Sequence, residues 1–581
     1  MNSKSIIKNI ILSRKNLIVS LSLMIVVTVA FRILNPLLLR HVVNKVIEND
    51  AQSGEIIFFS VLVLTLTFLT FVLEARRVTK ASTLGGDISS ALSEKAYSAI
   101  LRSELLDFNK LDQETTMKRI MNDTEEIGTK YFGRNLIPFV HESLIFMGLL
   151  ISLATIGPWY FLITLLTLPP YYLLVRYIKK MLNKSAENSK QILEQQSQIL
   201  NENFGKLKNI KLYNGIKAEE ERYSKLVQKI EKNNSKDYSL KNYSYGFASS
   251  FLVDIIFSII IWVGAFALLG KNATSQIGTI LVSFIIIPQI FNSFSKIQDL
   301  KIHPENIQQY ITQLDEIYSL KPENRADTVQ QLDEIYSLKF KDVCFDYGQG
   351  STFELDTINF EIKKGEKLGI LGLGNSGKTT IADLMTKIIR PKQGSVLLNN
   401  CDLNKINSYY LRELISVIPQ NIKLINDTIQ NNVTYPLPFD EYKYNDALNK
   451  TNLKPIISRL EARDQTLITD DSKLLTESES QLIAIANAFY KDSKIFLLDE
   501  ATSKFDQKTE NEIMEEVYKL KNKIILIMSN RIHNLVNCDK IIVLNNGRIL
   551  EYGKTSELLS DQKSTFARMV KDLDQTKSKV V

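Results

Sequence analysis

The sequence predicts a multidomain membrane protein in which an all-α domain of six transmembrane helices precedes an α/β domain. Three observations predict this class. Long uncharged runs are confined to residues 17–294, short apolar strand-like runs alternate with helical stretches from about residue 338, and a glycine-rich loop joins one such strand to a helix. The mean hydropathy of −0.05 and the 23% of charged residues therefore average over two different environments.

Each predicted transmembrane helix is an apolar run of about the 20 residues that cross a bilayer core. The runs are Leu17–Leu39, Ile56–Leu73, Ser143–Val175, Ser244–Leu269 and Ile277–Phe294. The third run is too long for one span, and Gly157-Pro158 divides it into spans at 136–157 and 158–175, which gives six in all. We assign residues 1–303 to this domain and expect the long polar segments 74–135 and 176–243 to form helical hairpins outside the membrane.

Basic residues near the N-terminus set the predicted orientation. The segment before the first span contains no acidic residue and four basic ones, Lys4, Lys8, Arg14 and Lys15. By the positive-inside rule the N-terminus is cytoplasmic, and six spans return the C-terminus to the same side. We therefore expect a multi-pass protein of the cell membrane, with the lipid bilayer as one partner.

Charge and cysteine content exclude other classes. The net charge of +7 is too small for a chain of 581 residues to indicate nucleic-acid binding. The three cysteines, Cys344, Cys401 and Cys538, form neither a disulfide framework nor a closely spaced metal pair.

Three charged residues lie within the predicted spans: Arg32, Glu142 and Asp254. A charge inside a membrane is costly, so each is a functional hypothesis by default. Either these side chains line a cavity, or Arg32 extends to the interface and the two acids pair with polar neighbours at helix ends. The sequence leaves both interpretations open.

A linker at 304–337 separates the two domains and contains a duplication. The nonapeptide QLDEIYSLK occurs at 313–321 and again at 331–339. Two copies are too few for a repeat architecture, so this is a local duplication. The first copy continues a helical pattern and the second runs into a strand pattern, so we expect helix in one and strand in the other. Residues 338–572 form the predicted α/β domain, and 573–581 a polar tail.

The glycine-rich loop has the sequence GLGNSGKTT and matches the phosphate-binding pattern GxxxxGK[ST] in its strand-to-helix context. The backbone N–H groups of such a loop bind phosphate oxygens. Lys378 is expected to reach the β- and γ-phosphates of ATP, and Thr379 to place its hydroxyl on Mg²⁺. The predicted binding residues are Gly372, Leu373, Gly374, Asn375, Ser376, Gly377, Lys378, Thr379 and Thr380.

A second motif follows some 120 residues later, where the apolar strand Ile495–Leu498 ends in Asp499 and Glu500. We predict that Asp499 holds the Mg²⁺ and its water shell. Glu500 is predicted to act as the general base on the attacking water.

With these motifs the chain resembles the ATP-binding cassette (ABC) exporters, in the half-transporter layout of six helices followed by one nucleotide-binding domain. The resemblance covers nearly the whole chain and implies a type IV exporter fold. It also implies that Tyr347 stacks on adenine, that Gln420 senses Mg²⁺ and that Asp506 is the acid of the D-loop. The segments around Phe108 and Leu212–Ile216 resemble the loops that dock on nucleotide-binding domains.

The chain departs from this family at the signature motif LSGGQ. The aligned signature segment is Leu475, Thr476, Glu477, Ser478 and Glu479. In the family this segment closes on the γ-phosphate held by the other subunit. Glu477 would place a carboxylate there, and two like charges about 4 Å apart cost roughly 4 kcal/mol at an effective dielectric of 20. We therefore expect a non-functional signature.

Two further positions differ. Asn530 stands where the family has its switch histidine, and asparagine cannot carry the charge. His533 lies nearby and is the alternative source of that role. Asn375 replaces a glycine of the phosphate-binding loop, but asparagine tolerates positive φ, so nucleotide binding is expected to survive.

These departures favour a heterodimer, because each site of the family pairs the phosphate-binding loop of one chain with the signature of the other. A homodimer would have a degenerate signature in both of its ATP sites. A partner chain with an intact signature would give the dimer one site with a regular signature. The first hypothesis is thus a subunit of an ATP-driven exporter of a peptide, lipid or hydrophobic compound. The alternative is a regulatory or sensing subunit that binds ATP but hardly hydrolyses it. An importer is disfavoured by the domain order.

Overall fold

The computed structural model describes residues 2–47, 53–241, 254–255, 257–259, 261–262, 273–300, 304–323, 332, 334–348, 354–374, 376–469 and 474–578. The chain divides into two compact units. The first comprises residues 1–99 and 112–319, and the second comprises residues 100–111 and 320–581. The division between Ser319 and Leu320 falls inside the predicted linker.

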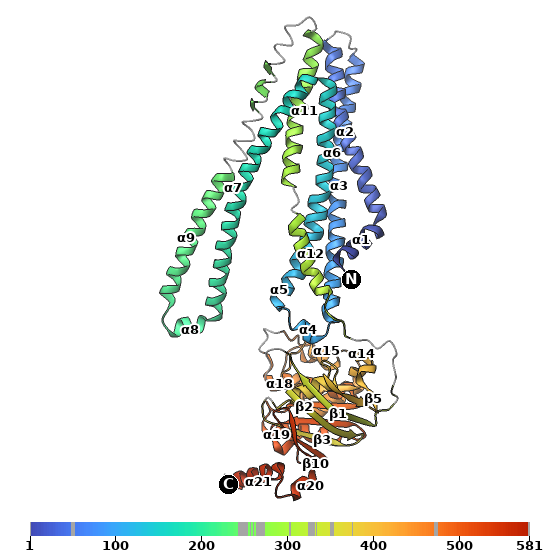
Figure 1. Ribbon diagram of the computed structural model, residues 1–581, viewed down its shortest axis with the longest axis vertical. Helices are drawn as coiled ribbons and strands as arrows, with labels where there is room; N and C mark the ends of the chain where they lie inside the picture. The colour runs from blue at the N-terminus through green and yellow to red at the C-terminus, as the bar shows by residue number, and fades with distance from the viewer. Residues whose placement is uncertain are drawn as a thin grey trace. The chain divides into compact units, whose positions relative to one another are not determined.

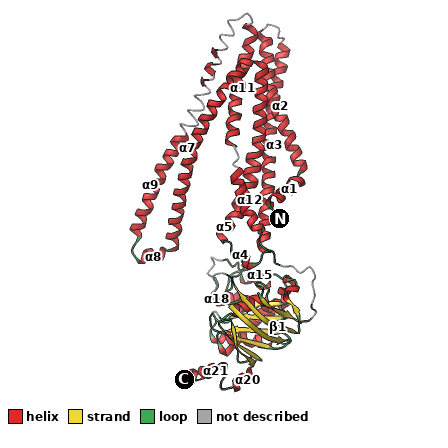
Figure 2. Cartoon of the chain, in the orientation of Figure 1, coloured by secondary structure: helices red, strands yellow, loops and turns green. Residues whose placement is uncertain are grey.

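The described residues of the first unit form helices joined by short turns, and no strand occurs among them (Figures 1 and 2). Its helices are α1 (Ser3–Ser13), α2 (Lys15–Ile47), α3 (Ser53–Leu101), α5 (Gln113–Lys118), α6 (Ile137–Ile156), α7 (Pro158–Gly205), α8 (Leu207–Leu212), α9 (Ile216–Lys241), α11 (Ala273–Asp299) and α12 (Pro304–Tyr318). Two π-helical stretches, Arg119–Asp123 and Glu126–Leu136, lead into α6. As expected for the segment after the fourth span, α7 and α9 form a helical hairpin with α8 at its tip (Figure 1).

Five helices among the described residues are long and apolar enough to cross a membrane: Lys15–Val46, Ser53–Leu101, Gln113–Ile156, Pro158–Ile178 and Ile277–Asp299. They correspond to the predicted first, second, third, fourth and sixth spans. Most of the predicted fifth span, 244–269, lies outside the described residues.

The core of this unit follows the helical period. Ile145, Leu149 and Leu153 of α6 recur every four residues, as do Val282, Ile286 and Ile290 of α11, and all six are fully buried in one cluster. The apolar packing of α6 against α11 therefore supports the bundle from inside, while other apolar side chains such as Leu166 remain exposed on its outside.

The second unit contains two sheets. The smaller sheet has the strand order β2-β1-β4-β5 and is antiparallel, with β1 (Ser337–Asp346), β2 (Glu354–Lys363), β4 (Gln393–Leu398) and β5 (Cys401–Asp402). The larger has the order β10-β9-β3-β8-β7-β6, with β3 (Lys367–Leu371), β6 (Ile415–Ile418), β7 (Ile495–Asp499), β8 (Ile524–Ser529), β9 (Lys540–Asn545) and β10 (Arg548–Lys554). All its strands except β10 run parallel.

The helices that accompany the two sheets are α13 (Lys378–Met385), α14 (Ser408–Glu413), α15 (Ile429–Thr434), α16 (Glu441–Lys450), α17 (Lys454–Ser458), α18 (Glu477–Lys491), α19 (Gln507–Lys519), α20 (Thr555–Ser560) and α21 (Thr565–Ser578). Because successive strand residues face opposite sides, Phe496 packs into one buried cluster and Leu497 into the other. Both faces of the larger sheet are therefore buried, as its continuous apolar strands predict.

The duplicated nonapeptide adopts two structures, as expected. Its first copy ends α12 at Tyr318, whereas Ser337–Lys339 of the second copy begin β1. The surroundings of each copy therefore decide whether the same nonapeptide forms helix or strand. At the other end, α21 continues to Ser578, so the predicted polar tail is helical over its first residues.

Candidate functional site

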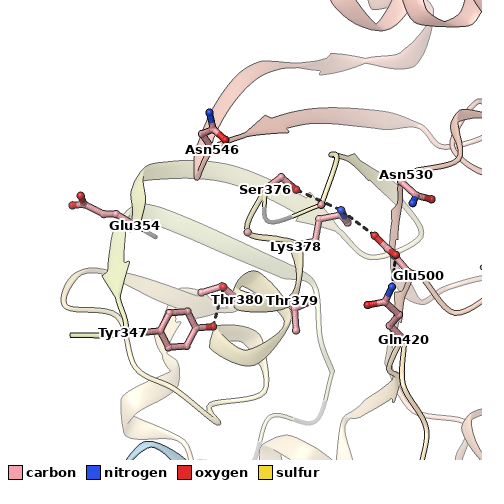
Figure 3. A pocket seen from close by; sticks show the side chains of 12 residues that line it. Tyr347, Glu354, Ser376, Lys378, Thr379, Thr380, Gln420, Glu500, Asn530 and Asn546 are labelled. Carbon is pink, nitrogen blue, oxygen red and sulfur yellow. Dashed lines mark hydrogen bonds and ion pairs between the residues drawn. The ribbon is translucent and has the colours of Figure 1, made fainter. Parts of the chain in front are cut away.

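The predicted phosphate-binding and acidic residues meet at the carboxyl edge of the larger sheet (Figure 3). Because β3, β7 and β8 are parallel neighbours, the loops that follow them open on the same side. A pocket of about 780 Å³ lies there. It is lined by Tyr347, Glu354, Gly374, Ser376, Gly377, Lys378, Thr379, Thr380, Gln420, Glu500, Asn530 and Asn546.

The loop between β3 and α13 folds around the amine of Lys378. Its Nζ donates to the carbonyl oxygens of Gly372 at 2.6 Å and Leu373 at 3.2 Å. Glycine is required at position 372, because a Cβ there would lie 2.3 Å from Ser376 Oγ, and Gly377 has a φ of +110°. The ammonium group is held at the mouth of the loop, where it can meet phosphate oxygens. Asn375 lies outside the described residues.

Thr379 and Asp499 form the part of the pocket that fits a magnesium ion. Thr379 Oγ1 donates to Asp499 Oδ2 at 2.8 Å, and Asp499 is buried. Burial raises the pKa of Asp499, and the hydrogen bond from Thr379 opposes that shift. A buried carboxylate whose charge is costly gains from a cation, and one or two protein oxygens completed by phosphates are what Mg²⁺ uses. The donor set therefore fits the ion.

Glu500 connects three motifs. Its Oε1 lies 3.1 Å from Lys378 Nζ, and its Oε2 accepts from Gln420 Nε2 at 2.7 Å. The Glu500 backbone has a φ of +49°, a strained value for a residue other than glycine, and its N–H bonds to the Met528 carbonyl in the neighbouring strand. Asn530 lines the same pocket near Glu500 (Figure 3). The structure thus brings together the predicted base Glu500, the predicted Mg²⁺ sensor Gln420 and the switch position Asn530.

Tyr347 lies at the opposite side of the pocket, after the end of β1. Its hydroxyl is 3.0 Å from Thr380 Oγ1, and its ring meets Phe345 edge-on with centroids 4.9 Å apart. The side chain is 45% exposed, so part of the ring remains accessible for stacking. This placement is consistent with the predicted contact to a base.

Two lining residues, Glu354 and Asn546, escaped the sequence analysis. Asn546 begins the Asn-Gly turn between β9 and β10, and the N–H of Gly547 bonds to the Ser376 carbonyl at 3.0 Å. An Asn-Gly pair signals a hairpin turn from sequence alone. The contact of this turn with the phosphate-binding loop depends on the order of strands in the sheet, so no local sequence pattern predicts it.

The signature segment forms the capped N-terminus of α18. Thr476 Oγ1 accepts from the Glu479 N–H, and the Glu479 carboxylate accepts from the Thr476 N–H. Glu477 is 81% exposed and lies 2.9 Å from Lys504 Nζ, while Ser478 Oγ donates to the Lys504 carbonyl at 2.7 Å. The first turn of the helix therefore carries two acids, of which Glu477 pairs with Lys504 and Glu479 pairs with Arg459 at 2.5 Å. Leu475 packs against the core behind it.

A buried glutamate, Glu510 of α19, organises the loops beside the site. It is fully buried, accepts from Thr502 at 2.7 Å and Asn534 at 2.6 Å, and pairs with Arg531 at 2.6 Å. His533 Nε2 lies 3.1 Å from the same carboxylate. His533 is thus engaged with Glu510 and does not line the pocket. Asp506 stands at the N-cap position of α19 and does not line the pocket either.

Comparisons with known proteins agree with the fold and with the order of the two domains. Residues 17–294 match the family described as "ABC transporter transmembrane region", and residues 355–503 match "ABC transporter". The chain is 25% identical over 498 residues to the ATP-dependent lipid A-core flippase of Wigglesworthia glossinidia brevipalpis, which covers 85% of each chain. The flippase of Salmonella typhimurium is 24% identical over 494 residues, or 84% of each chain.

A solved structure of a bacterial Atm1-family ABC exporter with ATP bound has the same fold, with a TM-score of 0.76 and 20% sequence identity. The match covers 96% of this chain and 98% of that one.

Proposed function

The chain belongs to the ABC exporters and has the half-transporter layout, and from this we propose that it is the degenerate half of a heterodimer that moves a lipid-like amphiphile out of the cytoplasm. As a member of this family, the chain is a membrane protein with ATPase and translocase activity. The lipid-like cargo is supported by the flippases among its relatives. The heterodimer is supported by the residues described next.

The single observation that carries the heterodimer is the N-terminus of α18. The Thr476–Glu479 capping box binds the N–H groups of these two residues, and Glu477 adds a second negative charge to the first turn. A helix N-terminus binds phosphate through free N–H groups and its positive dipole end. Two acids in the first turn oppose that role, so ATP bound by a partner chain would gain little from closing on this segment.

The residues with which this chain would bind ATP and activate water are retained. The backbone of the loop and Lys378 would bind the phosphates, and Thr379 and Asp499 would hold Mg²⁺, which when bound would screen the phosphate charge. Glu500, positioned by Gln420 and by its backbone bond to β8, accepts the proton of the attacking water. Such a site needs a signature from another chain, and a partner with LSGGQ supplies it.

The first cytoplasmic loop supplies the coupling element. Within the second unit, Glu104 pairs with Arg390 at 2.9 Å, and Leu106 of α4 (Leu105–Phe108) packs against the core that contains β3 and α13. The backbone N–H of Glu104 bonds to the Lys321 carbonyl, and that of Glu323 to the Arg102 carbonyl. Arg412 then holds Glu323 through two bonds at 3.1 and 2.8 Å. Movement of this domain would therefore act on residues 102–104 and residues 321–323 at the same time.

The test is to purify the tagged full-length chain from its native membrane and determine the stoichiometry and sequence of what copurifies. We expect one second half-transporter per chain, with LSGGQ and the switch histidine. A homodimer that hydrolyses ATP without any other half-transporter would contradict the proposal. A complex that binds ATP but shows no vanadate-sensitive hydrolysis would favour the regulatory alternative.

A further inference from the structure

We propose that a pocket between α2, α3 and α11 binds the oxyanion head of an amphiphile, with Arg32 as its charge partner. This inference rests on the proposed export function and names the class of cargo. The pocket has a volume of about 540 Å³, within the range of sites that enclose small ligands. All of its lining residues belong to the first unit.

Three helices contribute polar groups to this pocket, from within the apolar spans of α2 and α11 and from the end of the span in α3. Arg32 and Asn35 come from α2, Glu74 from α3, and Gln289 and Asn292 from α11. Polar side chains in membrane spans are costly unless they meet a partner or a water-filled cavity. Their convergence on one cavity therefore points to a polar ligand group.

The charge balance of the pocket is positive. Glu74 is already bound by Arg77, whose two nitrogens lie 2.6 and 3.3 Å from its two oxygens, and His141 Nε2 lies 3.5 Å away. Arg32 has no carboxylate within 4.0 Å in the described part of the chain and interacts with the same Glu74 only at longer range. One carboxylate is therefore shared between Arg77 and Arg32, which leaves an excess of positive charge at the pocket. An anion in the pocket would restore neutrality, and a planar guanidinium favours phosphate or carboxylate oxygens.

The remaining lining groups indicate the rest of the ligand. Asn35 Oδ1 is buried and has no hydrogen-bond partner among the described residues, although Nδ2 donates to Thr67 at 3.2 Å. That oxygen is suited to a hydroxyl or amide N–H beside the oxyanion. Leu39, Val63, Phe71 and Ile285 line the same pocket, and Phe71 is 72% exposed on the outside of α3. An apolar tail can therefore follow this side, which makes an amphiphile a better fit than a free anion.

The test measures binding of radiolabelled dodecyl phosphate to the full chain in phosphatidylcholine nanodiscs without ATP. We compare wild type with Arg32→Gln, Arg32→Lys and the matched control Arg76→Gln, which removes an exposed charge from α3 outside the pocket. We expect Arg32→Gln to weaken binding at least tenfold, Arg32→Lys to retain part of the affinity, and Arg76→Gln to bind as wild type. ATP binding by each variant reports that it is folded.

Unchanged binding by a folded Arg32→Gln variant would overturn the proposal, and so would an equal loss in Arg76→Gln, which would show attraction by surface charge. Competition arms identify the ligand class. Inorganic phosphate and dodecyltrimethylammonium should both compete poorly. If inorganic phosphate competes as well as dodecyl phosphate, the apolar tail is not recognised. If dodecyltrimethylammonium competes as well, the oxyanion is not recognised, and either result overturns the proposal. Because binding is measured without ATP, its result does not depend on whether the chain exports a compound. Binding could be found even if the export function were wrong, and a lack of binding would not contradict export.

Discussion

Replacing Glu477 with glutamine removes one negative charge from the start of α18 and keeps the size of the side chain. If the signature segment fails because of this charge, the variant should close more tightly on ATP held by a second chain. Glutamine also leaves the Thr476–Glu479 capping box intact. The change therefore isolates the charge from the structure of the helix end.

The magnitude follows from two opposing terms. A carboxylate about 4 Å from a phosphate charge costs roughly 4 kcal/mol at an effective dielectric of 20. Lys504, 2.9 Å from Glu477, offsets part of it, but an exposed ion pair of this kind is worth only about 0–1 kcal/mol. The remaining cost of about 3 kcal/mol corresponds to roughly a hundredfold in an equilibrium constant.

The assay is retention of radiolabelled ATP by the full-length chain carrying Glu500→Gln, which slows hydrolysis. We expect Glu477→Gln to tighten retention by about a hundredfold on this estimate. Glu461→Gln, an exposed carboxylate outside the signature segment, is the matched control and should change nothing. Less than a threefold change in the Glu477 variant would refute the electrostatic reasoning. The capping box and the lost glycines would then be the cause.

Other predictions test the remaining parts of the second unit. In a complex that hydrolyses ATP, Glu500→Gln should lower the rate by about 10²–10⁴ while ATP stays bound, as expected for loss of a general base; loss of ATP binding itself would contradict this role. Glu510→Ala removes the buried acceptor of Thr502 and Asn534 and the partner of the partly exposed Arg531, and the buried donors left unsatisfied should cost about 1–3 kcal/mol each of unfolding free energy. His533→Ala, at a partly exposed residue, should cost far less, and equal losses would refute the central role of Glu510. Burial, and then the charge of Asp499, raise the pKa of Asp383 to about 6, so the folded state holds this proton more tightly than the unfolded chain does. Its stability should therefore fall as pH rises from about 4 to 6, and Asp383→Asn should raise Tm at pH 7.5 but not at pH 4; a shift of the same size at both values would exclude this titration as the cause.

Local patterns predicted the elements whose signals are continuous in sequence. The apolar runs located α2, α3, α6, α7 and α11, because a span must be apolar along its whole length. The phosphate-binding loop and Asp499–Glu500 were found for the same reason, since each motif lies at the end of one strand. Their meeting in one pocket followed from the parallel order of β3, β8 and β7.

Features built from distant segments had no such signal. Glu510 has a polar sequence around it, and only the fold shows that Thr502, Arg531 and Asn534 surround it. The pairing of residues 102–104 with 321–323 joins segments more than 200 positions apart. Arg32 stood out as a charge within a span, but its polar neighbours on α11 appear only in three dimensions. Long-range packing decided each of these.

The central claim is that this chain cannot complete a hydrolytic site with a second copy of itself because its signature and switch position are degenerate. The direct measurement is the vanadate-sensitive ATPase rate of the purified full chain alone. It is compared with the same chain carrying Glu477→Gly, Ser478→Gly, Glu479→Gln and Asn530→His. We predict a rate near background for wild type and at least a tenfold gain for the restored chain. A wild-type rate equal to that of the restored chain would contradict the account.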